Sequence, residues 1–241
     1  MIPEIRRLLR PIYGKDEDGK AMLTDHPSVK DAENRPPIPG MGGMNSYFFT
    51  HEWPEAQDDH MSSCNRREAD MIVAFFDYLV LNGMDVPQIT VLTFYNGQRK
   101  AILCGLRRQP NLRAHGEAFK VVTVDSYQGE ENDVVLLSLV RSNDMGKIGF
   151  LNVVNRVCVA LSRAKRGFYM FGNGELLASE SWLWAEVVKV LVGVKGEKPE
   201  TGPVRRIGYR LPLVCQNHGR KTFIQEPDEF QELMLVGGCE I

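Results

Sequence analysis

The sequence predicts an α/β fold in which helices cover a mainly parallel sheet. Short apolar runs rich in β-branched residues alternate with longer segments whose apolar residues recur at helical spacing. Two of the runs, FKVVTVDS and DVVLLSLVRS, are nearly continuous, as in strands that are buried on both faces. With 43% hydrophobic and 25% charged residues, a chain of 241 residues is long enough to bury a substantial core.

The first half of the chain contains one amphipathic helix between a loop-rich start and a buried strand. PEIRRLL at residues 3–9 indicates a short helix. Residues 13–45 are rich in Gly, Pro and Asp and have no sustained period, so we expect a long loop or an insertion. A strand at residues 46–50 and a polar loop at 52–63 follow, and the helical spacing of apolar residues over 65–81 predicts the amphipathic helix.

The second half repeats the alternation of strands and helices. The strand at residues 88–95 is rich in β-branched residues, and the helix after it starts at the Asn96-Gly97 pair. A helix from about Asn152 to Arg163 is expected to end at Gly167 in a left-handed cap. The remaining predicted elements are the strands 119–126, 133–142 and 168–173 and a closing helix at 181–192.

Composition narrows the setting in which the protein works. No run of about 18 apolar residues is present, and the N-terminus lacks a basic region followed by a hydrophobic stretch and a cleavage site. The five cysteines are odd in number and scattered, which does not suggest a disulfide framework and fits a reducing compartment. We therefore expect an intracellular protein.

Charges are segregated along the chain although the net charge is only -2. Residues 86–116 contain five basic and no acidic side chains, and residues 141–173 contain six basic residues against Asp144 alone. Such segregation can create a basic surface for a polyanion. The alternative is that these side chains merely solvate helix faces.

Three acids mark the point where the chain enters a buried strand. Glu130, Glu131 and Asp133 lie between the two nearly continuous apolar runs. Ligands of open α/β sheets gather at the carboxyl ends of strands. We therefore expect these acids at that edge, with Glu130 and Asp133 alternatively serving only as turn and solvent-facing residues.

Two arginines suggest phosphate chemistry. Arg156 and Arg163 are seven residues apart, so in a helix they project from the same face about 10 Å apart. The planar, permanently charged guanidinium matches phosphate oxygens and stabilises charge on a transferring phosphoryl group. The alternative is that both arginines only solvate a surface helix.

The longest motifs resemble a known family. VVTVDSYQGEENDVVLLSLVRSN and GFLNVVNRVCVALSRAKRGFYMFGN, at this spacing, look like the last two signature motifs of superfamily 1 helicases of the nonsense-mediated-decay type. LTFYNGQRKAI is similar to the strand-turn-helix that precedes them, and MIPEIRRLLRPIYG resembles the segment that opens the second motor domain. The resemblance covers roughly residues 1–178 and implies a RecA-like fold.

Two departures from the family pattern are visible. The family has a Tyr-Arg pair directly before M-x-P-E-I, which here would precede Met1. The sequence also has no G-x-x-x-x-G-K-[ST] loop and no strand that ends in acids suited to magnesium. The chain therefore looks like the carboxyl-terminal half of a two-domain motor. We expect that it does not hydrolyse ATP alone and that it shares ATP and Mg²⁺ with a first RecA-like domain.

The resemblance implies roles for residues on the nucleotide side. The acid that matches Glu131 approaches the nucleotide at its sugar and magnesium side, and the turn from Ser126 to Gly129 couples nucleotide to nucleic acid. Arg163 matches the arginine that reaches the γ-phosphate across the cleft between two motor domains. Arg156 matches only a flanking position and is a second catalytic candidate.

The resemblance also implies nucleic-acid contacts at two strand ends. Tyr95 either stacks on a base, worth about 1 to 3 kcal/mol, or caps the sheet edge. Arg99 and Lys100 either contact phosphates or solvate a helix face. The candidate nucleic-acid residues are Thr93, Tyr95, Asn96, Gln98, Ser126, Gln128, Arg99 and Lys100.

The tail contains cysteine and histidine residues with part of the spacing of a zinc site. Cys215-x-x-His218 has the spacing of half a zinc site and Cys239 is a third potential ligand, with no clear fourth. The tail resembles the start of the cysteine-rich region in helicases with zinc fingers of the X-box-binding nuclear factor type. Helicases of that kind are associated with RNA silencing, heterochromatin and RNA surveillance, which favours single-stranded RNA, silencing-complex partners and a nuclear location.

We therefore expect a RecA-like domain at residues 1–178, a closing helix and linker at 179–200, and a finger-like tail at 201–241. The first functional hypothesis is the carboxyl-terminal motor domain of an ATP-dependent superfamily 1 RNA helicase. The second is a non-catalytic module that binds RNA or a helicase partner. A related DNA helicase is the third.

Overall fold

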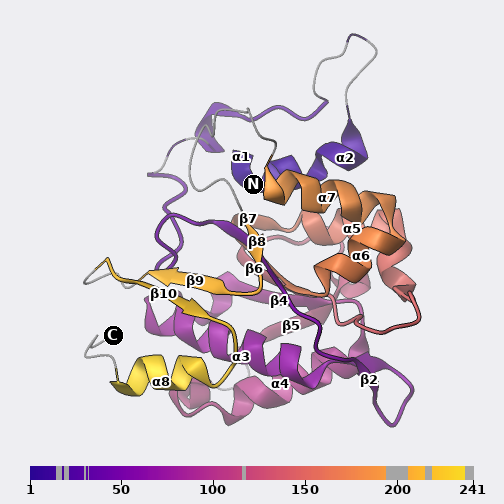
Figure 1. The fold of residues 1–241 in the computed structure, drawn as a ribbon. Coiled ribbons are helices and arrows are strands. Elements are labelled where there is room, and N and C mark those ends of the chain that lie inside the picture. Colours follow the sequence, from indigo (N-terminus) through magenta and orange to yellow (C-terminus); the bar gives the residue numbers. More distant parts are fainter. Residues whose placement is uncertain are drawn as a thin grey trace.

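A six-stranded, all-parallel sheet forms the centre of the molecule, which confirms the predicted fold class (Figure 1). The computed structural model describes residues 1–14, 18, 22–29, 31, 33–115, 118–193, 206–214 and 219–236. The strand order is β5-β4-β6-β7-β1-β8. The strands are β1 (Ser46–Thr50), β4 (Ile89–Thr93), β5 (Lys120–Thr123), β6 (Asn132–Ser138), β7 (Ala164–Gly172) and β8 (Ile207–Gly208).

Helices cover both faces of the sheet, and each face has its own apolar core. One face packs against α3 (Arg66–Leu81) and α4 (Asn96–Arg108). The other packs against α1 (Pro3–Arg6), α2 (Arg10–Tyr13), α5 (Val154–Leu161), α6 (Gly174–Glu180) and α7 (Trp182–Val192) (Figure 1). Strands β4 and β6 are almost completely buried between these layers, as the run DVVLLSLVRS predicts for β6. The same expectation is wrong for FKVVTVDS, because β5 is the outermost strand on its side of the sheet and three of its four residues are only partly buried.

The helix predicted over 152–163 is shorter in the structure, and the strand after it is longer. Helix α5 ends at Leu161, and β7 begins at Ala164 rather than at Phe168. Gly167 is therefore a strand residue and not a helix cap. A Cβ at this glycine would lie 2.8 Å from Cγ1 of Ile38, so close packing explains the glycine.

The described part of the tail packs onto the same body. Strand β8 extends the sheet beside β1, and β9 (Leu211–Val214) pairs with β10 (Lys221–Ile224) in a small antiparallel sheet. Helix α8 (Glu229–Val236) inserts Phe230 against Phe75 and Tyr78 of α3. These tail elements have no counterpart among the sequence-based predictions. A second hairpin, β2 (Ala56–Gln57) with β3 (Ser63–Cys64), lies in the predicted polar loop.

Within the described residues, no helix has the length and apolar character needed to cross a membrane.

Candidate functional site

The candidate residues on the nucleotide side and most of the candidate nucleic-acid contacts lie at opposite edges of the parallel sheet. The expectation that Glu130, Glu131 and Asp133 lie at the carboxyl ends of the strands is wrong. Residues 124–131 run from the end of β5 back to the start of β6, because β6 is parallel to its neighbour β4. The acids therefore lie at the amino edge, and so does Arg163, which directly precedes β7.

Arg163 is held in place by backbone and side-chain acceptors. Its Nε donates to the carbonyl oxygen of Val159 at 3.0 Å, and its Nη1 donates to the carbonyl oxygen of Glu130 at 3.0 Å. Its Nη2 donates to Oγ of Ser162 at 2.6 Å. A guanidinium has five N–H donors, so these contacts orient the group and leave donors for a further acceptor.

The three acids at this edge form ion pairs with neighbouring basic side chains. Glu131 Oε1 lies 3.1 Å from Nζ of Lys165, and Asp133 Oδ2 lies 3.2 Å from Nη1 of Arg166. Glu130 pairs with Lys120. Most of the Glu131 side chain, 59%, stays exposed, so it is accessible to a ligand, whereas only 23% of the Asp133 side chain is exposed.

The turn before β6 depends on a glycine. Gly129 is exposed and has φ of 84°, a backbone conformation that residues other than glycine adopt only at a cost in free energy. Apart from Gly129 and its two neighbours in the chain, no residue comes within 4 Å of the position of a Cβ there, so backbone conformation rather than crowding explains the glycine.

Arg156 and Arg163 do not share a helix face, contrary to the helical-spacing argument. Arg163 follows the end of α5, because the chain has already left the helix at Ser162. Arg156 lies on α5, where its Nε is 2.9 Å from Oδ1 of Asp125 and its guanidinium lies 4.5 Å from the centre of the Phe150 ring. The structure thus ties Arg156 to the segment after β5.

Most of the nucleic-acid candidates lie near the carboxyl ends of β4 and β5, which are adjacent strands. Gln128 lies further along the connection to β6, because the preceding Tyr127 already contacts Thr90 near the start of β4. Thr93, Tyr95 and Gln98 are buried, and Oε1 of Gln98 accepts from the backbone N–H of Asn65 at 2.8 Å. Ser126 donates from Oγ to the carbonyl oxygen of Thr123 at 2.9 Å. Arg99 is half-buried, and the exposed candidates are Asn96, Lys100, Ser126 and Gln128.

Tyr95 closes the carboxyl edge of the sheet. Its hydroxyl donates to the carbonyl oxygen of Ile148 at 3.4 Å and accepts from Nη1 of Arg141 at 3.4 Å. Burial raises the pKa of this phenol, and the nearby Arg141 opposes that effect. Tyr95 is only 6% exposed, and the centre of its ring lies 5.5 Å from that of Phe150.

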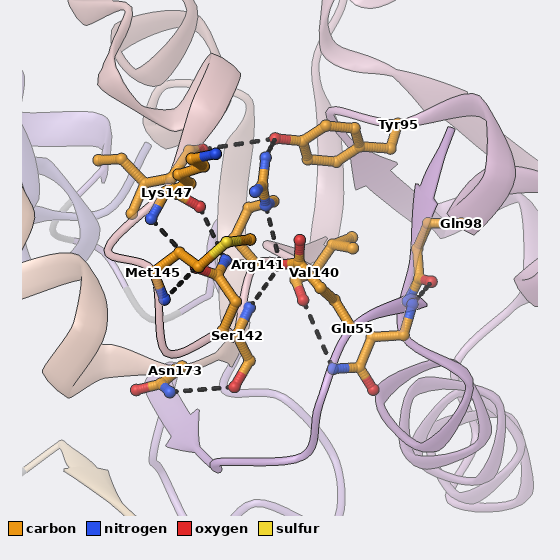
Figure 2. A network of polar contacts seen from close by, with 12 residues as sticks. Glu55, Tyr95, Gln98, Val140, Arg141, Ser142, Met145, Lys147 and Asn173 are labelled. Atoms are coloured by element: carbon orange, nitrogen blue, oxygen red, sulfur yellow. Dashed lines mark hydrogen bonds and ion pairs between the residues drawn. The ribbon is translucent and has the colours of Figure 1, made fainter. Parts of the chain in front are cut away.

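Sequence reasoning missed a polar network on the loop after β6, shown in Figure 2. Glu55 accepts from Nε of Arg141 at 2.8 Å, from the backbone N–H of Ser142 at 2.8 Å and from Nδ2 of Asn143 at 3.1 Å. Asn173, at the end of β7, donates to Oγ of Ser142 at 3.0 Å. One half-buried acid therefore fixes the Arg-Ser-Asn segment that the sequence places directly after an apolar strand.

The same loop begins with a strained residue. Val140 has φ of 70°, which is unfavourable for a β-branched side chain. The backbone N–H of Arg141 donates to the carbonyl oxygen of Leu139 at 2.7 Å, so the chain turns sharply here. The surroundings must stabilise this turn.

Glu68 of α3 provides that stabilisation from inside the protein. The side chain is fully buried, and Oε1 accepts from Oγ of Ser138 at 2.5 Å and from the backbone N–H of Val140 at 3.1 Å. Its Oε2 lies 2.9 Å from Nε2 of His51. Three elements, α3, the end of β6 and the end of β1, therefore meet at one carboxylate.

The structure does not bear on the zinc hypothesis directly. Cys215, His218 and Cys239 lie outside the described residues. In the described part of the chain, no three His, Cys, Asp or Glu side chains are grouped so that they could hold a metal ion.

Comparisons with known proteins match these motifs to one family. Residues 1–175 match the family described as "AAA domain". The chain is 41% identical over 235 residues to "Helicase required for RNAi-mediated heterochromatin assembly 1" of Schizosaccharomyces pombe, covering 98% of this chain and 21% of that protein. It is 40% identical over 243 residues to "NFX1-type zinc finger-containing protein 1" of Homo sapiens, covering 100% of this chain and 11% of that protein.

A shorter similarity extends to a further relative. The chain is 38% identical over 128 residues, or 53% of its length, to "Regulator of nonsense transcripts 1" of Caenorhabditis elegans, where the match covers 12% of that protein. The chain thus spans between about a tenth and a fifth of the length of these three relatives.

Proposed function

We propose a function from the premise that this chain belongs to the AAA domain family and is the carboxyl-terminal, RecA-like part of a superfamily 1 helicase. In the proposal, it is the second motor domain of an ATP-dependent RNA helicase. Its amino edge closes over a nucleotide that a first motor domain holds, and its carboxyl edge contacts nucleic acid.

The observation that carries the nucleotide part is the setting of Arg163. Its guanidinium is oriented by contacts to Val159 and Glu130 and lies at an open edge rather than in the core. Remaining N–H donors of such a fixed group match phosphate oxygens. In the proposal, Arg163 stabilises the charge that develops on the transferred phosphoryl group.

The residues at this edge fit ATP and Mg²⁺. The exposed carboxylate of Glu131 supplies oxygen atoms of the kind that bind a sugar hydroxyl or a magnesium-bound water. Gly129 shapes the turn that presents this carboxylate. When bound, ATP supplies the reactive phosphoanhydride, and the proposed role of these residues is to orient it and to balance its charge.

Contacts to nucleic acid are proposed for the exposed residues at the carboxyl edge. Asn96, Lys100 and Ser126 are accessible there, and Lys100 contributes positive charge. The exposed Gln128 lies further along the connection toward the amino edge. The buried Thr93, Tyr95 and Gln98 are proposed to support these residues from below. Binding should be sequence-independent and salt-dependent, because it rests on phosphate contacts.

RNA is the favoured substrate, and silencing is the favoured process. One relative is named for RNAi-mediated heterochromatin assembly and another for the regulation of nonsense transcripts. Heterochromatin assembly takes place in the nucleus, which supports a nuclear location and partners from a silencing complex. The name of the human relative includes a zinc finger, which motivates the proposal of a zinc-binding tail.

A chimeric helicase tests the proposal. The matching 235-residue segment of the S. pombe relative is replaced by this chain, and ATP hydrolysis is measured with and without single-stranded RNA. We expect RNA-stimulated hydrolysis by the chimera and none by this chain alone. A chimera that binds RNA but hydrolyses no ATP, next to an active parent, would contradict the proposed motor role and favour a non-catalytic binding module.

Competition between matched single strands of RNA and DNA tests the remaining alternative, a related DNA helicase. The two strands compete for the chimera at several salt concentrations, and hydrolysis is measured with each. We expect RNA to compete more effectively and to stimulate more hydrolysis. Equal or stronger effects of DNA would assign the chain to a DNA helicase.

A further inference from the structure

A cavity lies between helices α3 and α4 and the start of the tail helix α8. It has a volume of about 920 Å³ and is bounded by α3, α4 and the start of α8. We call it the α3–α8 cavity. Figure 1 shows α8 beside α3 and α4 on one face of the sheet. The residues that line it do not include Arg163 or any residue of the loop after β6.

The floor of the cavity is apolar. Val73 and Ala74 of α3, Gly105 of α4 and Phe230 of α8 contribute to its lining. A Cβ at Gly105 would lie 2.7 Å from Cγ2 of Val73, so the two helices are in close contact there. An apolar floor of this kind accommodates the methylene groups of a bound chain.

The walls of the cavity are rich in carboxylates. Asp77 is only 3% exposed, and its Oδ1 has no hydrogen-bond partner among the residues that the structure describes. The other oxygen, Oδ2, accepts only a neutral donor, Nδ2 of Asn111 at 3.2 Å. The acidic side chains in the lining are Asp70, Asp77, Glu226 and Asp228, against the two basic side chains Arg67 and Arg108.

Burial and neighbouring charges shift the pKa values of two of these acids. Burial raises the pKa of Asp77, and the hydrogen bond from Asn111 opposes this. Burial also raises the pKa of Asp70; the charge of Arg66 opposes this, and the charge of Asp228 acts in the same direction as burial. Arg67 is already paired with Glu226 at 2.7 Å. A buried carboxylate without a cationic partner is destabilising unless a ligand supplies the charge.

From these observations, we propose that the α3–α8 cavity binds an arginine side chain presented by a polypeptide segment of a partner protein. The apolar floor would hold the methylene groups, and the guanidinium would reach Asp77 and the neighbouring acids. Charge complementarity favours a cation, and the described lining has no grouping that could hold a metal ion. This inference is independent of the proposed motor function.

A peptide titration of the 241-residue chain tests the proposal. The probe is acetyl-Gly-Leu-Arg-Leu-Gly-amide, and the readout is the NMR signal of the Asn111 side-chain amide. We expect saturable shifts at Asn111 and Gly105. The matched peptide with citrulline in place of arginine, which has the same shape without the charge, should bind at least about tenfold more weakly.

Variants locate the site within the chain. Asp77→Asn should weaken binding of the arginine peptide at least about tenfold, whereas Asp59→Asn, in the exposed hairpin between β2 and β3, should leave it unchanged. If Asp77→Asn does not fold, Ala74→Leu replaces it, because this change fills the cavity without altering charge and should also prevent binding.

Three results would overturn the proposal. Equal affinity for the citrulline peptide would remove the charge argument, and wild-type affinity of the folded variants would exclude the cavity as the site. Spermidine that binds at Asn111 more tightly than the peptide would assign the cavity to a free polyamine instead.

The pH dependence of stability gives a separate prediction for Asp77. A carboxyl group whose pKa is raised by folding takes up a proton more readily in the folded state, so it contributes stability as the pH falls toward its unfolded pKa of about 4. At pH 7 this contribution is absent, and we expect Asp77→Asn to raise the midpoint of thermal unfolding by about 2 to 4 °C.

The difference between the two proteins should shrink as the pH approaches 4. Asp70, Glu226, Asp228, Arg67 and Arg108 also line the cavity but are present in both proteins, so the difference isolates Asp77. Thermal unfolding followed by circular dichroism at pH 7, 5.5 and 4 measures it. A variant that is less stable at pH 7 would show that Asp77 is already compensated within the chain.

Discussion

Replacing Arg163 by alanine in the chimeric helicase should lower kcat for RNA-stimulated ATP hydrolysis by at least about 1,000-fold, the range found for arginines that act on a transferring phosphoryl group. The side chain lies at the amino edge of the sheet, outside both apolar cores. Its loss removes hydrogen bonds to Val159 and Glu130 but buries no unpaired charge. The folded state should therefore survive the change.

Two further variants distinguish the loss of the guanidinium of Arg163 from the loss of a positive charge. Arg163→Lys keeps a charge but loses the planar pair of donors, so we expect activity to stay far below that of the parent chimera. Arg113→Ala, at an exposed position after α4, should leave kcat within about twofold. RNA binding is measured in parallel. Turnover by Arg163→Ala close to that of the parent would exclude the proposed role.

The sequence identified the parts of this site but assigned one part to the wrong edge of the sheet. The strand ends at Thr93 and Thr123 were expected to act together, and β4 and β5 are indeed neighbours. The turn with Glu131 was expected at the same edge as Tyr95. The eight-residue connection from β5 to β6 contains no α-helix, only a single 3-10 turn. The sequence therefore carries no local signal that this connection crosses the face of the sheet and ends at the opposite edge.

The sequence pattern also predicts a C-terminal end of helix α5 that is too late, for a related reason. The apolar spacing of Val157, Ala160 and Leu161 continues in phase to the residues after Ser162, so a periodic pattern alone extends the helix. In the structure, the backbone N–H of Asn132 donates to the carbonyl oxygen of Arg163 at 3.1 Å, and the strand starts there. Pairing with β6 is a long-range interaction, and it decides where the helix ends.

The tail shows the same limit of local patterns. Strand β8 has two residues, yet it pairs with β1, and Arg206 forms an ion pair with Glu4 near the N-terminus. Ser46 also donates from Oγ to Glu4 at 2.7 Å. Partners separated by up to 202 residues along the chain leave no periodic trace in the sequence.

Glu68 was also inaccessible to sequence reasoning, although it matters most for the loop after β6. Asn65 and Glu68 have the spacing of an ordinary helix start, and Oδ1 of Asn65 does accept from the backbone N–H of Glu68 at 3.1 Å. The carboxylate, however, points into the protein and binds Ser138, 70 residues away. Only the folded chain distinguishes a capping acid from a buried one.

We expect Glu68→Ala to lower the free energy of unfolding by about 3 to 5 kcal/mol, the range for removing one partner of a buried charged network. The change would leave the hydroxyl of Ser138, the backbone N–H of Val140 and the ring of His51 without their shared acceptor. It would also create a cavity beneath the loop. Urea unfolding followed by tryptophan fluorescence measures the loss.

Two controls distinguish the effect of removing a buried hydrogen-bond acceptor from the effect of removing any negative charge. Glu186→Ala removes a half-exposed acid that pairs with Lys189 on α7, and its effect should stay within about 0.5 kcal/mol. Glu68→Gln keeps one acceptor oxygen but directs an NH₂ group at donors, so it should cost about 1 to 3 kcal/mol. A loss below 1 kcal/mol for Glu68→Ala would mean that the strained turn at Val140 holds without it.

The Glu68→Gln variant also tests whether this buried acid affects RNA binding at the carboxyl edge of the sheet. It should remain folded while the turn at Val140 is less well fixed, and Arg141 and Asn143 follow that turn directly. If the loop after β6 helps to bind RNA, the affinity of the chimera should fall at temperatures where the variant is fully folded. Unchanged affinity would confine the role of Glu68 to stability and leave RNA binding to the strand ends of β4 and β5.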